Sequence, residues 1–249
     1  MAEYQDNFSA LYPHAASDVA GRRRKAATIR AVFADHFGAD RLRRLSLLDV
    51  GASTGVIDAE LATNFGTVVG VDIDRAAIDA ARRDYEAPNL SFGVADGMAL
   101  PFADAGFDAV LCAHVYEHVP EATHLMAEIR RVLKPGGVCY FAAGNRYQPV
   151  EPHYRLPLLS VVPKVVAHLY LRVLGRGKHY YEQHRSYWQL LDLVRDFERI
   201  DYTRGLIEEP ERFGLGYLLP RGSLKRLAAR LAVRAAYPFI PTYIWLLRR

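Results

Sequence analysis

The sequence contains little cysteine. Among its 249 residues only Cys112 and Cys139 are cysteines, and each lies within an apolar run. Two thiols in such positions do not make a disulfide framework, and they lack the paired spacing of a cysteine-based zinc site. We therefore expect reduced thiols and a cytoplasmic location.

A long hydrophobic segment and a strong charge of one sign are also lacking. The first 20 residues are polar and aromatic, without the apolar centre of a signal peptide. The apolar stretch 231–247 is interrupted by Arg234, Pro238 and Pro241, whereas a membrane-spanning helix needs about 20 apolar residues. The net charge of +4 is spread along the chain. We predict no transmembrane helix and no nucleic-acid partner.

What the sequence does contain is a regular alternation of two kinds of segment. Short apolar runs typical of buried strands occupy residues 45–50, 67–71, 90–94, 107–112 and 138–142. Helix-compatible segments occupy residues 22–37, 56–64, 75–85 and 121–133. This alternation predicts right-handed crossovers and a doubly wound parallel α/β sheet.

The alternation stops after residue 145 and resumes near residue 186. The later segments are a helix at 186–194, a strand at 197–202, a helix at 223–236 and a strand at 241–247. We predict one domain, divided into an N-terminal arm and helix (1–44), a cofactor-binding core (45–144), an insertion (145–185) and C-terminal helices and strands (186–249). Insertions at the carboxyl edge of such sheets commonly cover the substrate.

A glycine-bounded turn follows the first apolar run, and acids end the next strands. The run Leu47–Gly55 reads Leu-Leu-Asp-Val-Gly-Ala-Ser-Thr-Gly. It lacks the G-x-G-x-x-G spacing that wraps a pyrophosphate, which disfavours a dinucleotide-dependent dehydrogenase. Asp72 ends the second strand and Asp96 follows the third. An acid about 20 residues beyond the turn is placed to bind the ribose hydroxyls of an adenosine.

Five motifs, in order and spacing, resemble those of class I S-adenosylmethionine-dependent methyltransferases. They are Leu47–Gly55, Val69–Asp74, Ala95–Phe102, Phe107–Cys112 and Leu133–Gly137. The resemblance implies a Rossmann-like, seven-stranded, mostly parallel sheet with an antiparallel last strand and a helical or irregular insertion after the fifth strand. It also implies S-adenosylmethionine as the cofactor and S-adenosylhomocysteine as its product.

The resemblance assigns cofactor contacts residue by residue. Those at the methionine end would be Asp49, Gly51, Ala52, Ser53 and Gly55. Those at the adenosine would be Asp72 on the ribose, Ile73 on the adenine face, and Asp96, Gly97 and Met98 around the adenine amine and ring. His114 would lie near the sulfur that carries the methyl group.

Methyl transfer to an oxygen needs a group that removes a proton, and imidazole suits neutral pH. The candidate catalytic residues are His118, His114 and His153. Residues 114–118 read His-x-x-Glu-His, which could hold a metal or simply cap and pack a local turn. We predict no metal ligands, and leave Mg²⁺ open. In the insertion, Tyr and His clusters that include His179 and His184 would recognise an acceptor or form an ordinary surface loop.

The predicted activity is O-methylation of a small molecule, sugar or lipid-linked glycan with a histidine base. The alternative is a C- or N-methyltransferase acting on a quinone or lipid precursor. A dehydrogenase or a non-catalytic binding module is less favoured.

Two basic stretches admit two interpretations each. The run Arg22–Lys25 would be a solvated helix face or a contact for an anionic substrate or a membrane. In the helix at 223–236 the leucines and the arginines occupy different faces, so the simpler interpretation is that Leu224, Leu227 and Leu231 pack on the sheet and the arginines are solvated. The other is peripheral contact with an anionic membrane or a lipid-phosphate substrate.

Overall fold

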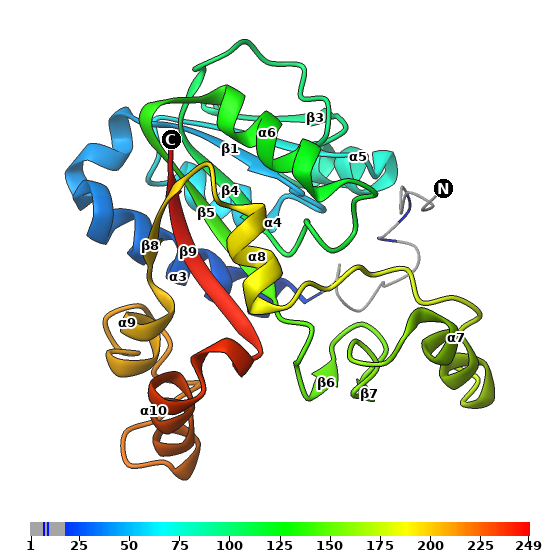
Figure 1. Cartoon of the computed structure of the whole chain (residues 1–249). Helices are drawn as coiled ribbons and strands as arrows, with labels where there is room; N and C mark the ends of the chain where they lie inside the picture. Colours follow the sequence, from blue (N-terminus) through cyan, green and yellow to red (C-terminus); the bar gives the residue numbers. More distant parts are fainter. Residues whose placement is uncertain (1–6, 8, 10–17) are drawn as a thin grey trace.

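The computed structural model describes residues 7, 9 and 18–249 (Figure 1). The arm predicted before residue 20 lies almost wholly outside these described residues. The remaining segments are described in their order along the chain.

Seven strands form one sheet in the order β3-β2-β1-β4-β5-β9-β8. Their bounds are β1 Ser46–Val50, β2 Thr67–Asp72, β3 Leu90–Val94, β4 Phe107–Ala113, β5 Leu133–Gly144, β8 Glu198–Asp201 and β9 Thr242–Arg248. The first five pair in parallel, and β9 is antiparallel to both β5 and β8. The predicted fold class, including its antiparallel last strand, is confirmed.

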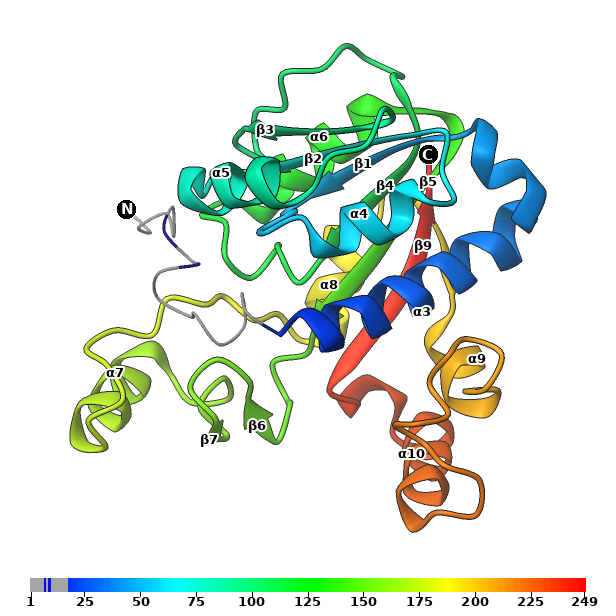
Figure 2. The same cartoon turned by 180° about the vertical axis from the view of Figure 1, so that it is seen from behind.

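Helices cover both faces of this sheet, which is why the central strands are apolar at successive positions. On one face lie α3 (Val19–Phe37) and α4 (Val56–Ala62), whose buried side chains share a core with β1, β4 and β5. On the other lie α6 (Ala122–Val132) and α8 (Tyr187–Leu193), which share a second core with the sheet. Helix α5 (Arg75–Asp84) connects β2 to β3, and Figure 2 shows it on the α3 and α4 side.

One strand boundary and one helix differ from the prediction. The fifth strand begins at Leu133 and not at Val138 because Leu133 already pairs with Phe107 of β4, after which the register shifts before Val138 pairs with Ala109. The six-residue helix α9 (Thr203–Glu208) was not expected from the sequence, since one and a half turns show no periodicity to detect.

The insertion begins and ends at one point beside the carboxyl end of β5. The Asn145 side-chain amide donates to the Ile240 carbonyl at 2.8 Å, and the Arg146 N–H donates to the Arg185 carbonyl at 2.9 Å. Between these anchors lie the short pair β6 (Val150–Glu151) and β7 (Leu156–Pro157) and the helix α7 (Lys164–Val173). A small core of its own, which includes Leu159 and Leu171, packs the insertion.

Helix α10 (Leu224–Ala235) has the opposite orientation to the one we expected. Leu224, Leu227 and Leu231 are 83%, 55% and 59% exposed. The arginines form ion pairs within the protein instead: Arg226 pairs with Glu211 at 2.6 Å, and Arg234 pairs with Glu208 at 3.1 Å. The interpretation that the leucines pack on the sheet is therefore wrong, because α9 and the segment after it bring acids to the arginines.

Across residues 7, 9 and 18–249, no helix is long and apolar enough to cross a membrane.

Candidate active site

The turn between β1 and α4 requires glycine at two positions. Gly51 has a φ of 94°, and a Cβ there would lie 2.5 Å from Cγ2 of Val115. Gly55 has a φ of 72°, and a Cβ there would lie 2.6 Å from the Phe92 ring. A side chain at either position would be strained and would clash. The shape of the turn at the carboxyl end of β1 therefore depends on these two glycines.

Two buried acids lie beneath this turn. Asp49, at the end of β1, is 3% exposed, and Asp58, in the first turn of α4, is fully buried. Burial, together with the nearby Asp58 and Asp72, raises the pKa of Asp49 well above its usual value. Burial also raises the pKa of Asp58 to about 7. Sequence reasoning missed Asp58 because an acid near the start of a helix is an ordinary feature.

A positive charge lies opposite these acids. The Arg22 Nη2 atom donates to Ser53 Oγ at 3.1 Å. Burial lowers the pKa of Arg22, against the attraction of Asp49, Asp58 and, more weakly, Asp72. The solvated interpretation is therefore wrong for Arg22, although its neighbours from Arg23 to Lys25 are exposed. The carboxyl group of Asp49 and the guanidinium of Arg22 together match the ammonium and the carboxylate of a free amino acid.

The adenosine side is formed by the ends of β2 and β3. Asp72 accepts from the Ser53 N–H at 2.8 Å and from the Asp74 N–H at 2.9 Å, on different oxygens. Each oxygen keeps a second lone pair for a ribose hydroxyl, although burial raises the pKa of Asp72. Asp96 accepts from the Met98 N–H at 2.7 Å, which orders the loop after β3.

The remaining predicted cofactor contacts lie in the same loops. Ala52 is buried in the glycine turn, and Ile73 directly follows Asp72 at the end of β2. Gly97 is buried, and a Cβ there would lie 3.0 Å from both Leu125 and Val50. The residues present fit S-adenosylmethionine, because the charges suit its amino acid part and the strand-end carboxylates suit its sugar and base.

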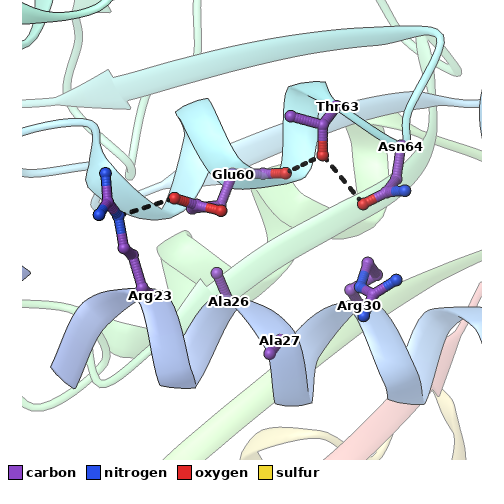
Figure 3. Close-up of a pocket in the computed structure, with 7 residues that line it drawn as sticks. All are labelled: Arg23, Ala26, Ala27, Arg30, Glu60, Thr63 and Asn64. Carbon is purple, nitrogen blue, oxygen red and sulfur yellow. Dashed lines mark hydrogen bonds and ion pairs between the residues drawn. The ribbon is translucent and has the colours of Figure 1, made fainter. Parts of the chain in front are cut away.

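A separate hollow of about 270 Å³ lies between α3 and α4. Figure 3 shows its lining, in which Arg23 pairs with Glu60 at 2.9 Å. None of the strand-end residues lines this hollow. We therefore place the site at the carboxyl ends of the strands and not here.

His114 directly follows β4 and contacts Glu117. It has a φ of 61° and donates its N–H to the Ala142 carbonyl at 2.9 Å. Its Nδ1 atom lies 3.3 Å from Oε1 of the buried Glu117. Burial opposes the ionisation of Glu117, but the hydrogen bond from His114 and the imidazoles nearby outweigh it and lower the pKa to about 2.

Further histidines and acids gather next to Glu117. The rings of His118 and His153 meet nearly at right angles, with centroids 4.9 Å apart. His153 Nδ1 lies 2.7 Å from Glu151 Oε1, and the same oxygen lies 3.5 Å from His184 Nε2. Burial lowers the pKa of His118 to about 4. Burial also disfavours the charged form of His153, but the hydrogen bond with Glu151 outweighs burial and raises the pKa of His153.

This cluster joins the turn after β4 to the insertion. The Gln183 N–H donates to the Glu117 carbonyl at 2.8 Å, which brings Glu182 and His184 to it. A cavity of about 320 Å³ adjoins the cluster and is lined by Glu182, His184 and the cations Arg146, Lys164 and Arg185, among others.

Not every candidate joins the cluster. His179 is exposed and meets the His168 ring edge to face, with ring centroids 5.4 Å apart. Glu151 and Glu182 were not chosen from the sequence, although each stands within two residues of a histidine or tyrosine that was.

The strand order, the antiparallel β9 and a site at the strand ends define the Rossmann-like methyltransferase fold. The sequence matches the methyltransferase domain family over residues 48–141. Residues 48–141 are thus similar to a methyltransferase domain, and the fold is that of the class I methyltransferases, whose cofactor is S-adenosylmethionine.

Similar proteins include enzymes of quinone biosynthesis. The chain is 30% identical over 167 residues to a demethylmenaquinone methyltransferase of Tropheryma whipplei, covering 66% of this chain and 64% of that protein. It is 28% identical over 144 residues to a ubiquinone biosynthesis O-methyltransferase of Coxiella burnetii, covering 57% of this chain and 58% of that protein. The chain thus spans less than two thirds of the length of these relatives.

A solved structure supports the fold. The S-adenosylmethionine-dependent methyltransferase from Mesorhizobium loti superposes with a TM-score of 0.53 at 15% identity, covering 82% of this chain and 91% of that one.

Proposed function

We propose that this chain transfers a methyl group from S-adenosylmethionine to an oxygen of a small molecule, a sugar or a lipid-linked glycan. The observation that carries this proposal is the continuity between the cofactor cradle and the histidine and glutamate cluster. His114 contacts Glu117, and Glu117 is next to His118, whose ring contacts His153. We further propose that residues 1–249 act as one methyltransferase domain.

When bound, S-adenosylmethionine supplies a methyl group already activated by a sulfonium. Asp49, supported by Asp58, would hold the ammonium of the cofactor, and Arg22 would hold its carboxylate. Asp72 would hold the ribose hydroxyls, with Ile73 and Met98 beside the adenine. These residues align the donor, which is the main requirement of an in-line displacement.

Of the three histidines considered as the base, we propose His114. It stands at the end of β4 beside the cofactor turn, and its side chain is 42% exposed, so an acceptor can reach it. The ionised Glu117 on Nδ1 would stabilise the imidazolium that forms when Nε2 takes the acceptor proton. His118 and His153 lie deeper and would contact the acceptor side.

The basic lining of the neighbouring cavity supports an acceptor with oxygens or an anionic group. The two relatives are named a demethylmenaquinone methyltransferase and a ubiquinone biosynthesis O-methyltransferase. Both names support a quinone precursor as the acceptor, and the second supports transfer to oxygen. Carbon or nitrogen transfer to a quinone or lipid precursor is the second candidate. We propose no nucleic-acid partner and a cytoplasmic location, supported by two free, buried cysteines.

We also propose that the protein contacts anionic membranes through α7 and α10. In the two opposite views both helices lie in the lower half of the molecule, on opposite sides of it (Figures 1 and 2). On α7, Val165 and Leu169 are 80% and 60% exposed, and Lys164, Arg172 and Arg176 are near them in the sequence. Exposed apolar side chains beside cations are typical of peripheral membrane helices.

The test is calorimetric titration of S-adenosylhomocysteine, followed by mass-spectrometric screening of quinones, sugars and glycolipids for a product heavier by one methylene. Saturable binding and an O-methylated product are expected. A wild-type protein that does not bind the cofactor product would refute the proposal. A C-methylated product would favour the second candidate.

A further inference from the structure

Three carboxylates and three imidazoles meet between the end of β4 and the insertion. The carboxylates are those of Glu117, Glu151 and Glu182, all buried. The imidazoles are those of His118, His153 and His184, and the His184 side chain is 2% exposed. Buried carboxylates are costly unless positive charge compensates them. Protons on the imidazoles, a metal cation or the cationic side chains that line the neighbouring cavity can supply that charge.

Three of these side chains have the geometry of metal ligands. His118, His153 and Glu182 each offer one ligand atom, and the three atoms lie within 4.8 Å of one another. Three ligand atoms about 2.1 Å from a common ion lie roughly 3.4 to 3.6 Å apart. Side-chain rotations that move each ligand atom by up to about 0.7 Å would therefore complete the site.

We propose that His118, His153 and Glu182 bind one divalent transition-metal ion of the Zn²⁺ or Mn²⁺ type. Two imidazoles and one carboxylate are a ligand set for such ions and leave coordination positions open. Glu182 also lines the cavity beside the cluster, so an acceptor hydroxyl or pair of hydroxyls can reach an open position. The ion would lower the pKa of that hydroxyl. This acceptor role rests on the proposed function, whereas binding of the ion does not.

A second set of three residues overlaps this one, and its geometry suits a supporting role. Glu151, His153 and His184 also lie within 4.8 Å of one another. Glu151 Oε1, however, is already 2.7 Å from His153 Nδ1. A carboxylate that accepts from one nitrogen of a metal-binding imidazole fixes the orientation of the ring. Glu151 is therefore a positioning residue for His153.

The proposed ligands also come from three separate segments. His118 follows β4, His153 lies between β6 and β7, and Glu182 lies after α7 near the return of the insertion to the sheet. One ion would bind both ends of the insertion to the turn after β4. Ion binding should therefore stabilise the insertion as well as the site.

The experiment uses the full chain without a histidine tag, stripped with chelator and dialysed against Mn²⁺ or Zn²⁺. Bound metal is measured by mass spectrometry of the protein solution, and Mn²⁺ also by electron paramagnetic resonance. His153→Gln and Glu182→Gln are compared with His124→Gln, an exposed histidine on α6. Circular dichroism of each metal-free variant shows whether it is folded.

We expect about one bound ion per chain in wild type and in His124→Gln, and affinity at least ~10-fold weaker in His153→Gln and Glu182→Gln. Glu151→Gln should keep the stoichiometry with weaker binding. The proposal is overturned if the wild-type protein binds no more metal than the buffer control. The cluster would then be a network of ion pairs in which protonated imidazoles compensate the carboxylates. Loss of binding in His184→Gln but not in Glu182→Gln also overturns the assignment. Neither readout involves methyl transfer, so failure here is distinct from failure of the proposed function.

Discussion

Replacing Asp58 by asparagine should change how stability depends on pH in the cofactor-free protein. The pKa of this carboxyl rises from 3.8 to about 7 on folding because burial disfavours its charged form, although hydrogen bonds with the backbone and with Asp49 oppose the rise. Between these pH values the native state keeps a proton that the unfolded chain releases, so stability falls as pH rises. At about 1.4 kcal/mol per pH unit the total loss approaches roughly 4 kcal/mol, and it levels off above about pH 7.

Asparagine cannot ionise, so the variant should lose most of this decline. The free energy of unfolding would be measured in urea by circular dichroism at several pH values between about 4 and 8. The variant should gain on wild type steadily across this range, whatever constant cost the substitution adds. Asp79→Asn, on the exposed face of α5, is the matched control and should follow wild type. Parallel curves for Asp58→Asn and wild type would refute the reasoning.

Three further outcomes are expected. Arg22→Ala should weaken S-adenosylhomocysteine binding about 10- to 100-fold in calorimetry, since a charged hydrogen-bond partner is lost. Arg23→Ala should not weaken it, because the Arg23 side chain pairs with Glu60 outside the site. Equal effects of the two substitutions would show that Arg22 does not belong to the site. His114→Gln should lower kcat for an oxygen acceptor about 10²- to 10⁴-fold, with nearly unchanged affinity for S-adenosylhomocysteine. A decrease in kcat of less than about 10-fold would favour a carbon or nitrogen acceptor. The double variant Leu227→Ser and Leu231→Ser should reduce flotation of the protein with phosphatidylglycerol vesicles, whereas Val19→Ser, on α3, should not. Unchanged flotation of the double variant would contradict membrane contact. Loss of a dimer on gel filtration would show instead that these leucines contact a second copy of the chain.

Much of the fold was predictable because its signals are local. Each parallel strand is a short apolar run, and the acids Asp49, Asp72 and Asp96 stand at or just after strand ends, so the parallel order alone brings them to one edge. The glycines of the turn were readable for the same reason. Their positive φ values and near contacts depend on a few adjacent residues.

The missed features depend on contacts between distant segments. Asp58 lies close to Asp49 only because α4 crosses back over β1. Arg22 reaches Ser53 from a helix 31 residues earlier, and a run of four basic residues does not indicate which one turns inward. Likewise, periodicity divided α10 into an arginine and a leucine face but could not indicate that Glu208 and Glu211 would bind the arginines.

The insertion leaves the sheet and returns to it at one place, where the Arg146 N–H donates to the Arg185 carbonyl at 2.9 Å. The proposed donor-binding residues lie outside the segment between these two anchors, whereas two of the proposed metal ligands, His153 and Glu182, lie inside it. The segment also contacts the turn after β4 through the hydrogen bond from the Gln183 N–H to the Glu117 carbonyl, so an exchanged segment must keep that contact. A chimaera that carries the insertion of another methyltransferase between these two anchors would keep the same methyl donor and acquire a new recipient.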